Sequence, residues 1–135
     1  VFNIRPNAAI VVEVTHATDS PGISAAQHGA VKMAEGPSIS IGRENHPALV
    51  KKIRDLAKAK KLKLQTEAFS TSGGTDAMAI YSAVGGVPTA VLGMPTRYMH
   101  STVEMVSLTD LQTTVDLIAA TCMSFEADET FTMGI

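Results

Sequence analysis

The sequence has no tryptophan, and only two tyrosines and four phenylalanines occur among its 135 residues. Carbohydrate-binding proteins usually stack sugar rings on aromatic side chains, so this scarcity argues against a polysaccharide-binding surface. The hydrophobic content is nevertheless 45% and the mean hydropathy is +0.16, which excludes a disordered chain. Aliphatic residues and seven methionines must therefore fill the core, as is common in layered α/β proteins.

A single cysteine, Cys122, excludes an internal disulfide and is typical of a reducing compartment, so we expect a cytoplasmic protein. Cys122 falls on the apolar stripe of the last expected helix, which favours a buried packing role over a nucleophilic one. No run of about 18 apolar residues is present, and the first residues do not resemble a signal peptide. We therefore expect no association with a membrane.

The net charge of −2 gives no general attraction for nucleic acids or anionic membranes. Seven of the 11 basic residues lie between Lys51 and Lys63, without an aromatic residue among them to stack bases. Within this segment the apolar positions recur at spacings of four, three and four residues, at Leu49, Ile53, Leu56 and the aliphatic stem of Lys60. This pattern predicts a helix with one buried stripe and a solvated basic face, and no nucleic-acid site.

Apolar runs predict strands at about 8–14, 38–41, 64–69 and 87–93, and periodic segments predict helices at about 47–60, 75–84 and 108–124. Strands alternating with helices favour an α/β fold, a three-layer αβα sandwich with a mixed, largely parallel sheet. No linker divides residues 1–135, so one domain is expected. In the last helix we expect one stripe to face the core, formed by Leu108, Leu111, Val115, Ile118 and Cys122.

The segment that follows the most apolar strand reads Pro-Thr-Arg-Tyr-Met-His-Ser-Thr-Val-Glu, residues 95–104. In α/β folds the carboxyl edge of the sheet is where ligands and metals bind. His100 is therefore a candidate metal ligand, and its alternative role is that of a loop residue hydrogen-bonded to the backbone. Arg97 could bind planar oxygen groups of a substrate. Its alternative is a salt bridge to Glu104 or Asp76.

Glu13 interrupts another apolar strand, Ala-Ala-Ile-Val-Val-Glu-Val. A carboxylate there is costly unless it is paired or bound to a cation, so Glu13 is a second candidate metal ligand. Thr75 and Asp76 stand at a strand-to-helix junction and could contact substrate or cap the following helix. Asp19, in Thr-Asp-Ser-Pro-Gly, is interpreted as a turn former.

Four segments in this order, VEVTHATDSPG, GPSI, SGGTDA and GGVPTAVLGMPTRYMHSTVE, resemble the tetrahedral aminopeptidase family, which includes glutamyl aminopeptidases and some members labelled endoglucanase. The resemblance covers about residues 3–120 and corresponds to the carboxyl-terminal half of the catalytic domain. It implies a dinuclear metallo-exopeptidase, a hydrolase with two divalent metal ions, zinc or cobalt. His100 falls on the family's last metal-binding histidine. Glu13 falls on a metal-binding carboxylate that is usually aspartate.

The resemblance also implies ligands that this sequence lacks. The family's first histidine, its bridging aspartate and the Glu-Glu pair that carries the general base have no counterpart here, and the small oligomerisation β domain is absent. One glutamate and one histidine make an incomplete zinc site, because stable sites need three or four ligands. We therefore expect a cloned, proteolytic or truncated piece of a homo-oligomeric enzyme, inactive alone and binding little or no metal.

The leading functional hypothesis is thus part of a metal-dependent aminopeptidase that removes amino-terminal residues from peptides. One alternative is a non-catalytic interaction module that kept the fold and lost the chemistry. Another is a polysaccharide hydrolase, which requires two carboxylates across a sugar-binding cleft. A partial catalytic domain should expose an unpaired sheet edge and apolar surface, which favours self-association.

Overall fold

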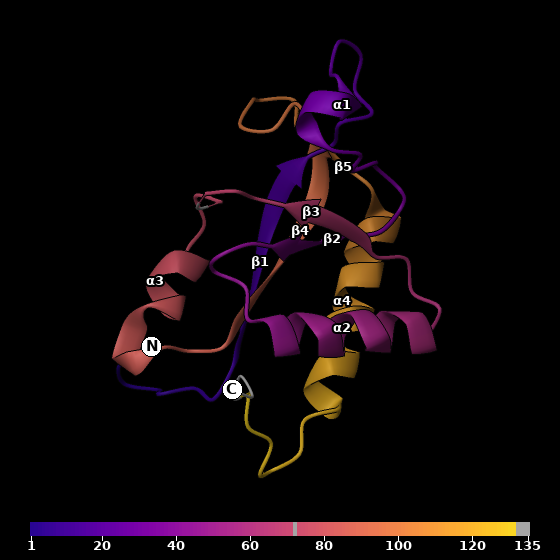
Figure 1. The fold of residues 1–135 in the computed structure, drawn as a ribbon. Helices are drawn as coiled ribbons and strands as arrows, with labels where there is room; N and C mark the ends of the chain where they lie inside the picture. The colour runs from indigo at the N-terminus through magenta and orange to yellow at the C-terminus, as the bar shows by residue number, and fades with distance from the viewer. Residues whose placement is uncertain (72, 132–135) are drawn as a thin grey trace.

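The computed structural model of the chain describes residues 1–71 and 73–131; Ser72, in the segment SGGTDA, and residues 132–135 lie outside them. Figure 1 shows the arrangement of the elements. The strands are β1 (Ala9–His16), β2 (Ser38–Ile41), β3 (Gln65–Ala68), β4 (Thr89–Arg97) and β5 (Met105–Val106). The helices are α1 (Ala25–His28), α2 (Pro47–Ala59), α3 (Ala77–Tyr81) and α4 (Leu108–Met123), with a 3-10 turn η1 (Ala83–Gly85).

The strands form one mixed sheet in the order β1-β4-β2-β3, and β5 pairs with β4. β1 lies parallel to β4 from the pair Ala9–Thr89 to the pair His16–Thr96. β2 and β3 are parallel to each other, whereas β2 meets β4 in antiparallel fashion over only two residue pairs. The expected mixed, largely parallel sheet is confirmed. Because of the antiparallel contact, β2 and β3 end away from the sheet edge at which β1 and β4 end.

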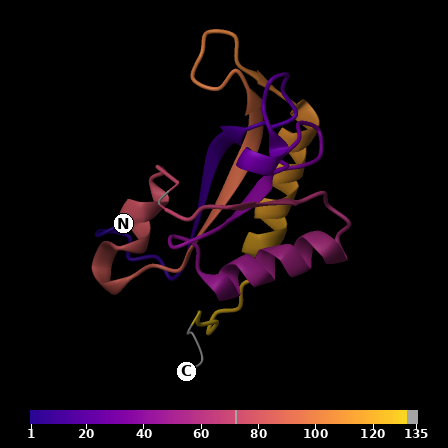
Figure 2. The same cartoon turned by 45° about the horizontal axis from the view of Figure 1, so that its top comes forward.

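Helices cover both faces of this sheet, which confirms the αβα layers. α2 and α4 pack on one face, and Figure 2 shows α3 on the other side of the strands. The larger core contains Ile39, Leu49, Val50, Ile53, Ala57, Ala90, Leu92 and Leu117. The smaller core, under α3, contains Val11, Ala77 and Val91. No helix in the described residues is long and apolar enough to span a membrane.

The expected long helices agree with α2 and α4 to within one residue at each end. The expected helix at 75–84 is instead the short α3 followed by η1. β4 extends four residues past its expected end, through Pro95 to Arg97. Pro95 lies opposite Thr15 in the ladder with β1, and on the other side of β4 it falls between the residues that pair with β2 and those that pair with β5.

Two expectations about buried helix faces are wrong. In α2, Leu49 and Ile53 are buried as expected, but Lys60 is exposed. In α4 most of the expected stripe faces outward: Leu108 is 76% exposed, and Leu111, Val115 and Cys122 are also exposed, whereas Ile118 is half-buried and packs against the larger core. The buried face of α4 consists instead of Asp110, Thr114, Leu117, Ala120 and Thr121.

Hydrogen bonds explain why polar residues of α4 can face the core. Asp110 accepts the backbone N–H groups of Ala34 at 2.7 Å and Gly36 at 2.8 Å. The hydroxyls of Thr114 and Thr121 each donate to a carbonyl one turn earlier in the helix. A buried polar group with its hydrogen bonds made costs little, so Asp110 fixes the rotation of α4 against the sheet.

We expect Asp110→Asn to lower the free energy of unfolding by about 1–3 kcal/mol, because an amide NH₂ would face one of the two buried N–H donors. The matched control is Asp116→Asn on the exposed side of the same helix, which should change stability by less than about 0.5 kcal/mol. Urea denaturation measures both. Equal effects of the two substitutions would contradict the role given to Asp110.

Like the outward face of α4, β1 exposes apolar side chains. Val12 lies beside Leu92 in the sheet register, so Val12 and Val14 point to the face that carries α4, and both are exposed. Among the described strands β1 pairs only with β4, which leaves its outer edge open. Unpaired edges and apolar surface of this kind promote association between chains.

The chain should therefore self-associate at micromolar concentrations, and Val115→Glu, in the middle of the exposed stripe, should shift it toward monomer. Gln112→Glu is the charge-matched control on the same helix, and it should leave association unchanged. Light scattering across a dilution series measures the average molar mass of each variant. A wild-type chain that stays monomeric at all concentrations would contradict the prediction that this apolar surface drives self-association.

Candidate functional site

The parallel pairing of β1 with β4 positions the two candidate metal ligands. Glu13 lies opposite Gly93 in the register, and His100 follows the end of β4 by three residues. The backbone of the intervening turn is left-handed at Tyr98, with φ 56°, and at His100, with φ 63°. Residues other than glycine adopt this conformation at an energetic cost, and such strain is concentrated at functional sites.

Glu13 is partly buried on the same face of β1 as the buried residues Val11 and Thr15. Its carboxylate makes no hydrogen bond or ion pair with any described residue. A carboxylate partly removed from water is costly without a compensating charge. Glu13 therefore retains the capacity to bind a cation. The space above Gly93, its neighbour on β4, is taken by the side chains of Thr15 and Ser38.

The imidazole of His100 is exposed and also has no hydrogen-bond partner within the described part of the chain. The carboxylate of Glu104 accepts the main-chain N–H of His100, which fixes the turn and leaves the ring nitrogens unused. The expected alternative, an imidazole hydrogen-bonded to the backbone, is therefore not what the described residues show.

Arg97, the last residue of β4, pairs with Asp19 at 2.9 Å and with neither Glu104 nor Asp76. The two expected ion-pair partners of Arg97 are therefore wrong. Asp19 was interpreted only as a turn former, because nothing in its own segment shows that β1 ends beside β4. The Nε atom of Arg97 is buried without a partner among the described residues, so the guanidinium retains a donor for planar oxygen groups.

The remaining candidates, Thr75 and Asp76, precede α3 and lie away from the sheet edge at which β4 ends (Figure 1). The hydroxyl of Thr75 accepts the backbone N–H of Ala77 at 3.2 Å, the capping type of contact that was its alternative role. The side chain of Asp76 is exposed and does not cap the helix. Thus Glu13 and Arg97 lie on two adjacent strands and His100 lies in the turn after the second, whereas Thr75 and Asp76 stand apart from them.

A polar bridge crosses the sheet beside Glu13. The hydroxyl of Thr15 donates to Oε1 of Glu67 at 2.7 Å, and the hydroxyl of Ser38 donates to Oε2 at 3.1 Å. The bridge passes over Gly93, where a Cβ atom would lie 2.7 Å from the Ser38 hydroxyl. Sequence reasoning missed Glu67, because its partners come from two distant strands. The only signal is a glycine within an otherwise apolar strand.

Glu13 and His100 fit a divalent metal in donor type, since zinc accepts both carboxylate oxygen and imidazole nitrogen. Within residues 1–71 and 73–131, no group of three or more histidine, cysteine, aspartate or glutamate side chains is arranged to hold a metal ion. Glu13 and His100 are too few to form such a group by themselves.

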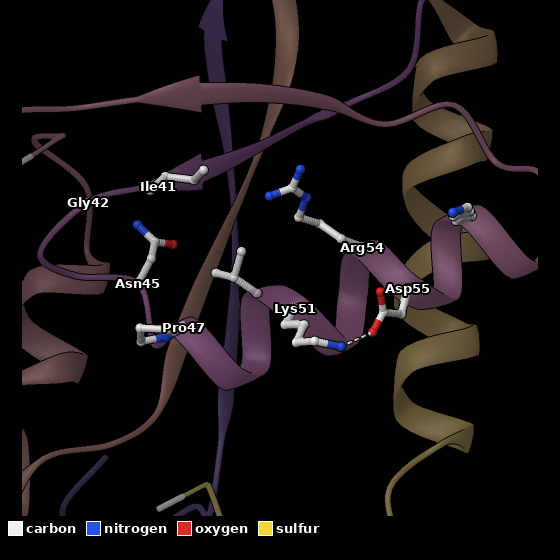
Figure 3. Close-up of a pocket in the computed structure, with 9 residues that line it drawn as sticks. Ile41, Gly42, Asn45, Pro47, Lys51, Arg54 and Asp55 are labelled. Carbon is white, nitrogen blue, oxygen red and sulfur yellow. Dashed lines mark hydrogen bonds and ion pairs between the residues drawn. The ribbon is translucent and has the colours of Figure 1, made fainter. Parts of the chain in front are cut away.

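A cavity of about 740 Å³ lies elsewhere, along α2 and the end of β2 (Figure 3). Lys51, Arg54 and Lys58 line it, and Lys51 pairs with Asp55 at 2.6 Å. The hydrogen bond from Lys51 holds the pKa of Asp55 below its usual range. This exposed groove contains none of the candidate residues and corresponds to the solvated basic face expected for the helix.

In this three-layer αβα fold, Glu13 on β1 has no partner among the described residues, and His100 follows the end of the adjacent parallel strand β4. Comparison with known proteins gives the family. The profile described as M42 glutamyl aminopeptidase matches residues 1–117, so the chain belongs to this family. The resemblance seen in the sequence is confirmed.

Individual relatives agree. The lysyl aminopeptidase of Pyrococcus furiosus is 33% identical over 121 residues, which are 88% of this chain and 34% of the relative. The crystal structure of a TET aminopeptidase from a Thaumarchaeota archaeon superposes with a TM-score of 0.85 at 32% identity, over 94% of this chain and 36% of that one. The PhTET1-12s structure, a dodecamer, superposes with a TM-score of 0.70 at 30% identity. The match covers 89% of this chain and 34% of that one. The chain thus spans about a third of the length of these relatives.

Proposed function

We propose that the chain is the carboxyl-terminal part of the catalytic domain of a metal-dependent aminopeptidase, which removes amino-terminal residues from peptides. Its family membership and the aminopeptidase names of its relatives support this activity. The observation that carries the proposal is the unpartnered, partly buried carboxylate of Glu13 on the strand parallel to the one that leads into His100. We further propose that the parent protein is a homo-oligomer, as the dodecameric relative is.

In this proposal Glu13 and His100 are two of the ligands of a pair of divalent metal ions, zinc or cobalt. When bound, such a pair supplies an activated water and polarises the scissile carbonyl. Glu13 reaches one methylene further than the aspartate usual in the family. The strained turn at His100 holds the imidazole beyond the end of β4, at the edge that substrate must approach.

Three further residues are proposed to bind the peptide. Arg97, held by Asp19, offers its remaining N–H donors to planar oxygens of the substrate. A peptide bound at Glu13 lies on the sheet face that α3 covers, because Val11 on that face packs against α3. Asp76 and Thr75, at the amino end of α3, would then contact the more distant part of the bound peptide.

The isolated chain should show no aminopeptidase activity with Zn²⁺ or Co²⁺, because it presents two ligands and no recognised general base. A chimera provides the positive test: this chain replaces the matching third of the Pyrococcus furiosus relative, which supplies the rest of the domain. The chimera should cleave leucine p-nitroanilide, and His100→Ala or Glu13→Ala should lower kcat/KM by about two orders of magnitude or more.

His46→Gln is the matched histidine control for the chimera, because His46 precedes α2 on a different element and lies outside the proposed site. It should keep activity close to that of the unsubstituted chimera. An active chimera that tolerates His100→Ala would contradict the ligand assignment. Turnover by the isolated chain that disappears with His100→Ala would contradict the claim that the ligand set is incomplete.

A further inference from the structure

A second cavity, of about 360 Å³, lies between β3 and the segment that joins β1 to β2, and neither the family assignment nor the metal-ligand proposal uses it. Its polar lining includes the carboxylate of Glu67, and Ile23 and Phe69 contribute apolar surface. His16, Thr18 and His28 complete the lining. The cavity therefore combines one acidic group and two imidazoles with apolar walls that suit a hydrocarbon chain.

The charge of Glu67 is held in place but not neutralised. Both carboxylate oxygens accept hydrogen bonds from neutral hydroxyls, those of Thr15 and Ser38. No lysine, arginine or amino terminus among the described residues forms an ion pair with Glu67. Each carboxylate oxygen can accept a second hydrogen bond. A partly buried anion that keeps open acceptor positions binds a cationic donor more strongly than a neutral one.

Glu67, which lines the cavity, is linked through Thr15 to the strand that carries the proposed metal ligand. Glu13 and Thr15 are two residues apart on the same face of β1, which separates their Cα atoms by roughly 7 Å. Thr15 in turn holds Glu67. A four-carbon lysine stem spans such a distance and can lie along apolar surface while its ammonium group reaches a polar partner.

We propose that this cavity binds the basic side chain of the substrate's amino-terminal residue, with Glu67 as the group that selects a lysine-like ammonium. This inference rests on the proposed function for its meaning in catalysis, since the α-amine of that residue would lie at Glu13. The selection itself is a property of the cavity and requires neither metal nor turnover.

The direct test uses n-butylammonium, the analogue of the lysine side chain, added to the ¹⁵N-labelled 135-residue chain without metal. Its amide shift changes should centre on Thr18, Ile23 and Glu67. We expect it to bind about tenfold more tightly than n-butanol of the same length, as one charge-assisted hydrogen bond allows. Equal affinity for the alcohol and the ammonium ion would overturn the inference.

Two substitutions act on the cavity in different ways. Glu67→Gln keeps an acceptor for Thr15 but removes the charge, and it should abolish the preference for ammonium. Ile23→Lys places an ammonium group at the mouth of the cavity without altering the hydroxyl bridge, so it should block the ligand even if Glu67→Gln folds poorly. Glu35→Gln, an exposed glutamate paired with Lys63, is the control and should keep the preference. Retained preference in both cavity variants would also overturn the inference.

The proposed function and this inference can fail separately. In the chimera, Glu67→Gln should reduce kcat/KM for lysine p-nitroanilide about tenfold and leave the leucine substrate unchanged. An inactive chimera whose isolated chain still prefers butylammonium would contradict the proposed function alone. An active chimera in which Glu67→Gln affects both substrates equally would contradict the lysine pocket alone.

Discussion

The parallel ladder between β1 and β4 is the constraint on which the rest of the arrangement depends. Its eight residue pairs fix Glu13 opposite Gly93 and bring the end of β1 beside the end of β4. The ladder continues into the loops, where the N–H of Ala17 donates to the carbonyl of Thr96 and Asp19 meets Arg97. A shift of one residue would turn Glu13 to the opposite face, because side chains alternate along a strand.

Gly93 has a second role within the same ladder, because it leaves space on the face that carries Glu13. The hydroxyls of Thr15, on β1, and of Ser38, on β2, converge there on Glu67 of β3. Two carboxylates with different surroundings consequently lie near each other. Glu13 has no partner in the described chain, whereas Glu67 is fixed by two hydroxyls. This difference underlies the separate roles proposed for them, metal binding and recognition of a cation.

Much of the fold was predictable from local patterns, since the long helices and the four principal strands follow apolar periodicity and capping signals. The buried face of α4 was not, because Asp110 faces the core only by accepting N–H groups from residues 34 and 36, more than 70 positions earlier. The partner of Arg97 and the importance of Glu67 were missed for the same reason. Within the candidate site, Glu13 was recognisable as an acid inside an apolar strand, and His100 as a histidine that follows another apolar strand. Thr75 and Asp76 were assigned to the same sheet edge only because the antiparallel contact of β2 with β4 was not foreseen.

The central claim is that Glu13 and His100 contribute to one metal site, and paramagnetic NMR tests it even if binding is weak. Co²⁺ is titrated into the ¹⁵N-labelled chain, and broadening of amide signals is mapped by residue. The account predicts broadening around both residues at once, and predicts that Glu13→Gln removes it around His100 just as His100→Ala removes it around Glu13. Broadening around His100 that survives Glu13→Gln, or that centres on His16 and His28 instead, would contradict the shared site.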